Sequence, residues 1–190
     1  MTVMLAAALA GGPAMALPPP PSPVSVTPVE QSQLDRREVV VRYSGPGQET
    51  LAIMDMRAEP AVVMREVMNL APRQDEMSGI QSLQIYEASP GHTAARWEVG
   101  IAMFSAIFHI RYDCDMPGGW CVYALDESKD NTIESSRGSY QVYPLGEGSR
   151  MVYRSVSVGS ASTPEWLSKK LATGSARDML SGIRARAEGA

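Results

Sequence analysis

Cysteine and histidine are scarce in this sequence, which has only two of each among its 190 residues. His92 and His109 lie far apart, and there is no HExxH motif or Cys/His cluster, so we predict no metal site and no cofactor. The chain also lacks a glycine-rich phosphate loop between a strand and a helix, and it lacks a Gly-x-Ser-x-Gly elbow. The usual sequence grounds for nucleotide chemistry and for serine hydrolysis are therefore absent.

Runs of positive charge are missing as well. The chain has 17 Lys and Arg against 21 Asp and Glu, a net charge of -4, and no stretch of five or six basic residues. Aromatic and basic residues are too thinly interleaved for a nucleic-acid platform. We therefore expect no nucleic-acid partner, and at most transient contact with a membrane. The length suits one folded domain, whose oligomeric state the sequence leaves open.

A long hydrophobic run is also lacking, although an apolar segment stands at the start. Residues 1–16 carry no charge and end in Ala-Met-Ala at residues 14–16, the small-x-small pattern of a secretory cleavage site. The segment is shorter than the roughly 20 residues that a membrane span needs. The alternative is a buried helix, which Gly-Gly-Pro at residues 11–13 would break. Although a basic n-region is missing, we predict a signal peptide and hence a periplasmic or secreted protein.

The two cysteines, Cys114 and Cys121, flank a Met-Pro-Gly-Gly sequence that is typical of a β-hairpin turn. If the hairpin pairs symmetrically about Pro117 and Gly118, the two thiols stand opposite each other, at a separation compatible with a disulfide. Their spacing is unlike a CxxC motif. A bridge would agree with export, because disulfides persist outside the cytosol. The alternative is a pair of reduced, buried cysteines.

Proline is concentrated near the start of the chain, and the residues after this segment show the hydrophobic periodicity of strands and helices. Residues 17–35 predict an extended, solvated linker, and we expect the folded domain at residues 36–190. Short connections between the strand patterns favour antiparallel hairpins. Strands are predicted at residues 39–43, 50–57, 80–88, 93–103, 105–114, 120–125, 132–143 and 150–158. Helices are predicted at residues 58–70 and 163–187, with a polar helical turn or loop at residues 73–79.

The predicted last helix has one apolar face. It follows a Thr-Pro-Glu cap at residues 163–165, and its face runs through Leu171 and Met179. Gly174 and Gly182 fall on or beside that face. Their missing side chains either leave room between helix and sheet or allow close packing.

The order of these elements is that of the helix-grip fold over residues 50–187. The sequence Met-Asp-Met-Arg-Ala-Glu-Pro-Ala-Val-Val at residues 54–63 resembles the strand-to-helix entry of polyketide-cyclase-like and ubiquinone-binding members of the START-like (SRPBCC) superfamily. Thr-Pro-Glu-Trp-Leu at residues 163–167 resembles the start of their last helix. The extra strand at residues 39–43 and the proline-rich linker depart from the usual pattern.

The resemblance implies an α+β fold in which a curved antiparallel sheet wraps around a long C-terminal helix, with short helices after the first core strand. It also implies an apolar cavity that holds a lipid, quinone, sterol or polyketide-like molecule. The superfamily shares no catalytic residue, so none is predicted from it. Candidate ligand contacts must come from this chain's own residues.

Inward-facing residues of the predicted sheet and last helix are the candidate ligand contacts. Methionine suits a flexible ligand, because its side chain is unbranched and polarizable, although it also fills ordinary cores. Arg154 shares a strand face with Val152 and Val156. It either meets a ligand headgroup, pairs with an acidic residue or lies on the surface. The predicted set is Met54, Met56, Trp97, Ile101, Met103, Phe108, Ile110, Tyr112, Arg154, Leu171 and Met179.

Three functions are compatible with the sequence. The first, which we prefer, is an exported, non-enzymatic binding protein or carrier for a hydrophobic small molecule. The second is a cyclase- or aromatase-like enzyme that uses Tyr112, Arg154 or His109, the last of which is predicted opposite Asp126. More often such a His–Asp pair is an exposed cross-strand pair. The third is a structural or adaptor domain of the cell envelope with a filled core.

Overall fold

A single antiparallel sheet dominates the structure, a computed structural model that describes residues 20–22, 24–101, 103–159 and 164–189. The predicted signal peptide lies outside the described residues, as does the side chain of Ile101. In the described part, the sheet has eight strands in the order β1-β2-β8-β7-β6-β5-β4-β3. The strands are β1 (Val40–Tyr43), β2 (Thr50–Met56), β3 (Ile80–Ser89), β4 (His92–Ile101), β5 (Phe104–Asp115), β6 (Trp120–Leu125), β7 (Ser135–Leu145) and β8 (Gly148–Val158).

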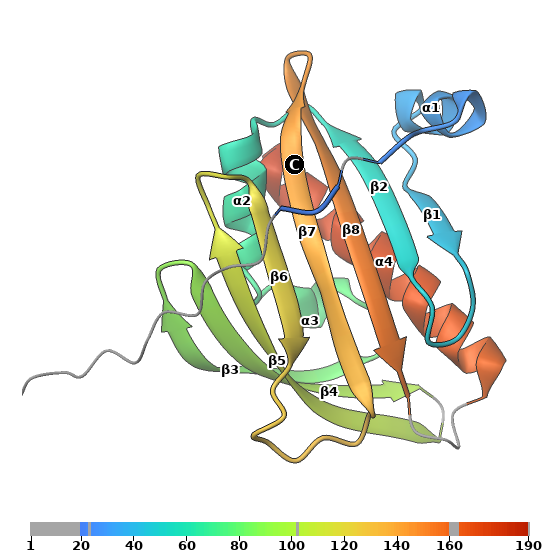
Figure 1. The fold of residues 1–190 in the computed structure, drawn as a ribbon, viewed down its shortest axis with the longest axis vertical. Coiled ribbons are helices and arrows are strands. Elements are labelled where there is room, and N and C mark those ends of the chain that lie inside the picture. Colours follow the sequence, from blue (N-terminus) through green and yellow to red (C-terminus); the bar gives the residue numbers. More distant parts are fainter. Residues whose placement is uncertain (1–19, 23, 102, 160–163, 190) are drawn as a thin grey trace, which may run out of the picture.

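Three helices lie against the inner face of the curved sheet (Figure 1). The helices α2 (Pro60–Met68) and α3 (Arg73–Glu76) follow β2, and α4 (Glu165–Ala187) runs along the sheet as the last element. The main core fills the space between these helices and the strands. This is the predicted helix-grip architecture. None of the described helices is both long enough and apolar enough to cross a membrane.

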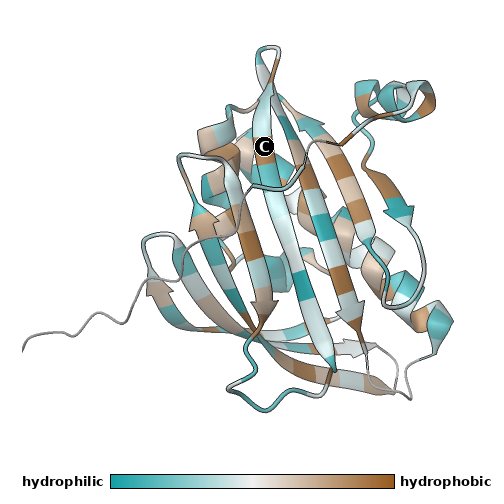
Figure 2. Ribbon diagram, in the orientation of Figure 1, coloured by the Kyte–Doolittle hydropathy of each residue, from teal (hydrophilic) through white to brown (hydrophobic). Residues whose placement is uncertain are grey.

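Both faces of the sheet carry apolar residues around β2. Met54 and Met56 face the helices, whereas Leu51 and Ile53 face the opposite side, since successive side chains of a strand alternate. β8 likewise carries apolar residues on both faces, since Met151 belongs to the main core and Val152 to a cluster on the outer face. Both hydrophobic and hydrophilic residues are seen along this strand in Figure 2. On the outer face, the segment after Pro21 crosses β7 and β8 toward the N-terminal helix (Figure 1). A second, smaller apolar cluster is buried beneath it.

The predicted linker contains that N-terminal helix, α1 (Pro28–Asp35), so the prediction of an extended chain through residue 35 was wrong. Thr27 caps α1: its hydroxyl accepts from the backbone N–H of Glu30, whose carboxylate accepts from the backbone N–H of Thr27. Leu34 is buried in the outer cluster. Proline content concealed this helix, because Pro28 occupies its first turn, where proline is tolerated.

An ion pair with β1 also anchors α1. Arg42 donates to Glu30 from Nε and from Nη2, each at 2.6 Å. The Arg42 guanidinium and the Thr27 backbone N–H lower the pKa of Glu30 to about 2. The first turn of α1 is therefore tied to the edge of the sheet through a carboxylate that stays ionised under most conditions.

The β5–β6 hairpin has the predicted register and contains the predicted bridge. Cys114 and Cys121 are direct cross-strand partners, their Cα atoms are 4.0 Å apart, and they form a disulfide. Gly119 ends the turn with a φ of 74°, a conformation that suits glycine. A Cβ there would also approach the Val142 carbonyl oxygen to 2.5 Å. The sequence at this turn therefore fixes both the hairpin and the pairing of its cysteines.

Candidate functional site

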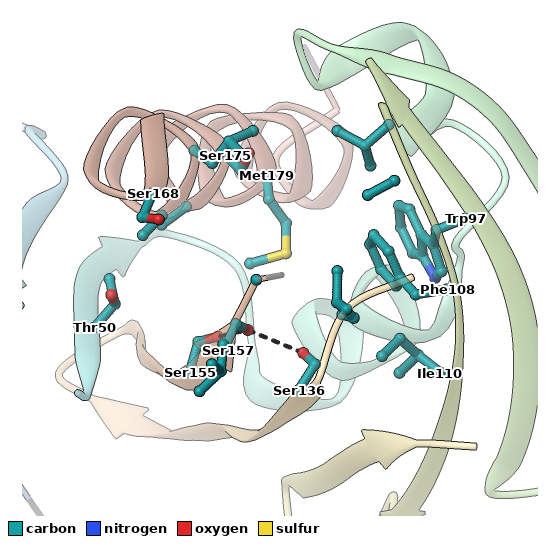
Figure 3. Close-up of a pocket in the computed structure, with 18 of the residues that line it drawn as sticks. Thr50, Trp97, Phe108, Ile110, Ser136, Ser155, Ser157, Ser168, Ser175 and Met179 are labelled. Carbon is teal, nitrogen blue, oxygen red and sulfur yellow. Dashed lines mark hydrogen bonds between the residues drawn. The ribbon is translucent and has the colours of Figure 1, made fainter. Parts of the chain in front are cut away.

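A cavity of about 250 Å³ lies between the inner face of the sheet and α4. Figure 3 shows its three walls, with α4 on one side, β4 and β5 on another, and β7 and β8 on the third. Lining residues around Pro46, Gly47 and Gln48 are exposed, whereas Tyr112 and Tyr140 are buried. The cavity therefore opens near the β1–β2 connection and ends among buried aromatic residues.

The wall from β4 and β5 is apolar. Trp97 and Phe108 are direct cross-strand partners, and their rings stack with centroids 6.5 Å apart and planes 8° apart. Ile110 continues this surface on β5 (Figure 3). Such a wall binds apolar ligand surface through the hydrophobic effect and dispersion. The apolar residues that line it are Ile80, Trp97, Val99, Ala106, Phe108 and Ile110.

The opposite wall carries hydroxyl groups. Ser136 on β7 and Ser155 and Ser157 on β8 line the cavity, and the hydroxyl oxygens of Ser136 and Ser157 are 3.0 Å apart (Figure 3). Serine hydroxyls both donate and accept hydrogen bonds. A ligand in this cavity therefore meets an apolar surface on one side and polar atoms on the other.

The helix α4 closes the cavity with a mixed surface that includes Leu171, Ser175 and Met179. Neither glycine that the sequence analysis singled out lines it. A Cβ at Gly182 would collide with the Glu76 carboxylate of α3, so this glycine permits helix packing. No neighbouring atom lies within 4 Å of a Cβ placed at Gly174.

Four tyrosines on successive strands form the inner end of the cavity. Tyr112 and Tyr123 are cross-strand partners on β5 and β6, and Tyr140 and Tyr153 are partners on β7 and β8. Neighbouring ring centroids in the cluster are 5.1 to 6.2 Å apart. The hydroxyls of Tyr123 and Tyr153 are hydrogen-bonded at 2.9 Å. Side chains that the sheet brings together thus supply a cluster of phenols.

Burial keeps three of these phenols neutral. It raises the pKa values of Tyr112 and Tyr123 well above their usual range and raises that of Tyr153 to about 12, because a phenolate would lose its hydration there. Each of these three hydroxyls therefore retains its proton at neutral pH and carries no charge.

Arg73 is the one charged side chain among the described residues that line the cavity. It comes from α3 and is only 1% exposed. Its Nη1 donates to the Tyr140 hydroxyl at 3.2 Å, its Nη2 donates to the Val67 carbonyl oxygen, and its guanidinium carbon lies 5.5 Å from the Tyr140 ring centroid. The inner end of the cavity therefore combines neutral phenols with one cation.

Most of the predicted ligand contacts lie at the cavity, and some do not. Met54 and Met56 are buried in the main core and are not lining residues. Met103 is 90% exposed, so its predicted inward position was wrong. It lies beyond the end of β4 at Ile101, where the strand alternation that predicted its direction no longer applies. The predicted residues that line the cavity are Trp97, Phe108, Ile110, Tyr112, Leu171 and Met179.

The prediction that Arg154 faces a ligand was also wrong. Tyr153 and Ser155 line the cavity, so Arg154 points to the outer face of β8. There it pairs with Glu49 at 3.4 Å and donates to the Ser22 carbonyl oxygen at 2.9 Å. Val152, which shares its face, is buried in the outer cluster together with Val24 and Val26 of the N-terminal segment.

His109 does not lie at the cavity either. Its backbone carbonyl accepts from Asp126, in line with the predicted register, but the Asp126 carboxylate accepts from the Tyr86 hydroxyl and Ser128. The His109 ring lies 3.3 Å from the Asn131 side-chain oxygen and against the Tyr86 ring. The His–Asp pair of the enzyme hypothesis is therefore not formed, and its position is on the outer side of β5.

Sequence reasoning missed Arg73 and three of the four tyrosines. Arg73 fell in a segment interpreted as a polar helical turn or loop, and the four residues of α3 are too few to show an apolar periodicity. Tyr123 could have been found from the alternation that it shares with Cys121 along β6. For Tyr123 the periodicity was present and was not followed to the polar residue.

The fold can be compared with solved structures, although no family model and no curated protein matches this sequence. A START superfamily protein from Mycobacterium smegmatis is 15% identical over 75% of this chain and 99% of its own, with a TM-score of 0.61. The STAR-related lipid transfer protein from Xanthomonas axonopodis is 13% identical over 79% of this chain and 92% of its own (TM-score 0.63). The Zhui aromatase/cyclase from a Streptomyces species is 17% identical over 75% of this chain and 87% of its own, with a TM-score of 0.53. The chain therefore has the START-like (SRPBCC) helix-grip fold.

Proposed function

We propose that this protein binds a hydrophobic small molecule in the cavity between the sheet and α4. The observation that carries the proposal is the cavity itself, which has an apolar wall, a hydroxyl-bearing wall and a buried inner end. Ligand sites are concave and mostly apolar, with a few polar groups that orient the ligand. Proteins of similar fold include a STAR-related lipid transfer protein and an aromatase/cyclase, which agrees with an apolar ligand.

The cavity also favours binding over the other two functions. A structural domain with a filled core does not need a space of about 250 Å³ beside its main helix. Of the three residues proposed for cyclase chemistry, Arg154 and His109 lie outside the cavity, and only Tyr112 lines it. Burial raises the pKa of Tyr112, so almost no phenolate is available at neutral pH to act as a general base. A carrier or binding role therefore requires fewer additional assumptions than an enzymatic or a structural role.

A neutral fluorescent probe tests the proposal. N-phenyl-1-naphthylamine, whose emission rises in apolar surroundings, should bind the wild-type protein with one site per chain. Ala172 lines the cavity from α4, so Ala172→Trp should fill the space and abolish most of the signal. Lys170→Trp adds the same side chain at an exposed position of α4 and should leave binding unchanged. Absence of binding, or equal binding by both variants, would contradict the proposal.

We further propose that the protein is exported and that residues 1–16 are removed. The Cys114–Cys121 disulfide supports this, since such bonds form outside the cytosol. N-terminal sequencing after expression in a bacterial host should give Leu17 as the first residue of periplasmic material, and deletion of residues 1–16 should retain the protein in the cytoplasm. Uncleaved protein in the cytoplasmic fraction would argue against export.

A further inference from the structure

Arg73 is an unusual residue to find at the inner end of an apolar cavity. No carboxylate of the described residues lies within salt-bridge distance of it, although nine other arginine–carboxylate pairs are formed in the same part of the chain. Arg73 remains protonated, because a guanidinium does not lose its proton in proteins at neutral pH. The cavity therefore presents one uncompensated positive charge.

The Arg73 guanidinium also has an N–H donor that no acceptor among the described residues satisfies. Arginine has five N–H groups, of which the Tyr140 hydroxyl and the Val67 carbonyl oxygen accept from two. The Nε atom of Arg73 is buried and has no hydrogen-bond partner. Buried donors in folded proteins are nearly always satisfied, so an unpaired donor at a cavity indicates a missing acceptor.

A buried cation without a counter-ion is costly, because the charge has lost its hydration and gains no ion pair in return. Tyr140 offsets part of this cost through one hydrogen bond and a cation–π contact. Tyr112 and Tyr123 supply no negative charge at neutral pH, since burial raises their pKa values. The remaining charge can be neutralised by an anion that enters the cavity.

We infer that the ligand is an apolar carboxylic acid whose carboxylate binds Arg73 at the tyrosine cluster while its apolar body lies along Trp97 and Phe108. A single negative charge matches the single positive charge of the lining. A planar carboxylate also fits the fork of a guanidinium better than an ammonium or alcohol group does. The inference rests on the proposed binding function and specifies the ligand class that it would serve.

The size of the cavity agrees with a compact acid. Its volume of about 250 Å³ lies just below the range of roughly 300–1,000 Å³ that is common for small-molecule sites. A molecule with one chain or a small ring system fits this space more readily than a two-chain phospholipid. Decanoate, 1-decanol and decylammonium form a matched set of probes with one body and three different headgroups.

Displacement of bound N-phenyl-1-naphthylamine by the three probes tests the inference. Decanoate should displace the dye from the wild-type protein at a concentration roughly tenfold or more below that of 1-decanol or decylammonium. Arg73→Met should remove this preference while leaving displacement by 1-decanol nearly unchanged. Arg154→Met, which removes an arginine from the outer face, serves as the matched control and should keep the preference.

The outcomes separate the two proposals. Dye binding with no preference of the wild type for decanoate would overturn the inference about Arg73 and leave the binding function standing. Failure to bind the dye or any of the three probes would overturn both. If Arg73 only anchors α3 to α2 and β7, Arg73→Met would weaken all three probes equally, which also contradicts the inference. Tyr140→Phe keeps the charge and removes the hydroxyl that accepts from Arg73 Nη1, so it provides a second variant that should reduce the preference only in part.

Discussion

Gly138 lies directly opposite Tyr123 on the neighbouring strands β7 and β6, and the Tyr123 hydroxyl occupies the space that a side chain at Gly138 would fill. A Cβ placed at Gly138 would come within 2.5 Å of the Tyr123 hydroxyl oxygen and would also collide with the Arg154 carbonyl oxygen. The glycine therefore permits the central tyrosine of the cluster to lie across the sheet. The shape of the inner end of the cavity depends on this pair.

Gly138→Ala should destabilise the protein by about 1–3 kcal/mol, because the added methyl group overpacks a contact that includes backbone. Gly174→Ala provides the control, since no atom lies within 4 Å of a Cβ there and α4 continues through it. That substitution should stabilise the protein by about 0.5–1 kcal/mol. Urea unfolding of the two variants measures both effects. A change of the same sign in the free energy of unfolding of both variants would contradict the different roles given to Gly138 and Gly174.

Removal of the Cys114–Cys121 bridge should lower the free energy of unfolding by about 2–3 kcal/mol, since the bond closes a short loop in the unfolded chain. The double variant Cys114→Ala/Cys121→Ala and the reduced wild-type protein should give similar values by thermal unfolding. Thiol labelling of denatured, unreduced protein is the control. Labelling of both cysteines before reduction would show that the bridge does not form.

The hairpins could be predicted from the sequence because local rules determine them. Alternating residues and turn glycines gave the bounds of β6 and the pairing of Cys114 with Cys121. The face of a strand that points inward was harder to predict, because β8 carries apolar residues on both sides. Val152 is buried by a segment more than a hundred residues earlier in the chain, and no local pattern reveals that cover. Local patterns therefore left three positions open for Arg154, and its choice as a ligand contact was wrong.

The inner end of the cavity was harder to predict than its apolar wall. Clear alternating patterns on their strands allowed the sequence to assign three residues to the cavity wall, Trp97, Phe108 and Ile110. The tyrosine cluster depends on the registers between β5, β6, β7 and β8, which bring together residues up to 41 positions apart, Tyr112 and Tyr153. Arg73 joins them from a four-residue helix that gives only a weak periodic signal.

The anchor of α1 should depend on pH through Glu30. The folded-state pKa of Glu30 is about 2, which lies below its ordinary value. The carboxylate therefore stabilises the fold at any pH above its ordinary pKa, and this stabilisation is lost as the pH falls toward 2. Glu30→Gln should cost about 1 kcal/mol at pH 7 and almost nothing at pH 2. The control is Glu38→Gln, which alters the exposed pair with Arg36 and should have little effect at either pH. A pH-independent cost for Glu30→Gln would contradict the ion-pair role.

The most direct test of a ligand in the cavity is NMR of the methionine methyl groups during titration with N-phenyl-1-naphthylamine. Met77 and Met179 line the cavity, whereas Met103 is exposed. If the probe binds in the cavity, the methyl signals of Met77 and Met179 shift and saturate together at one probe per chain, while the signal of Met103 stays in place. Shifts confined to Met103, or shifts that never saturate, would show that the probe binds the surface and would contradict a hydrophobic binding site between the sheet and α4.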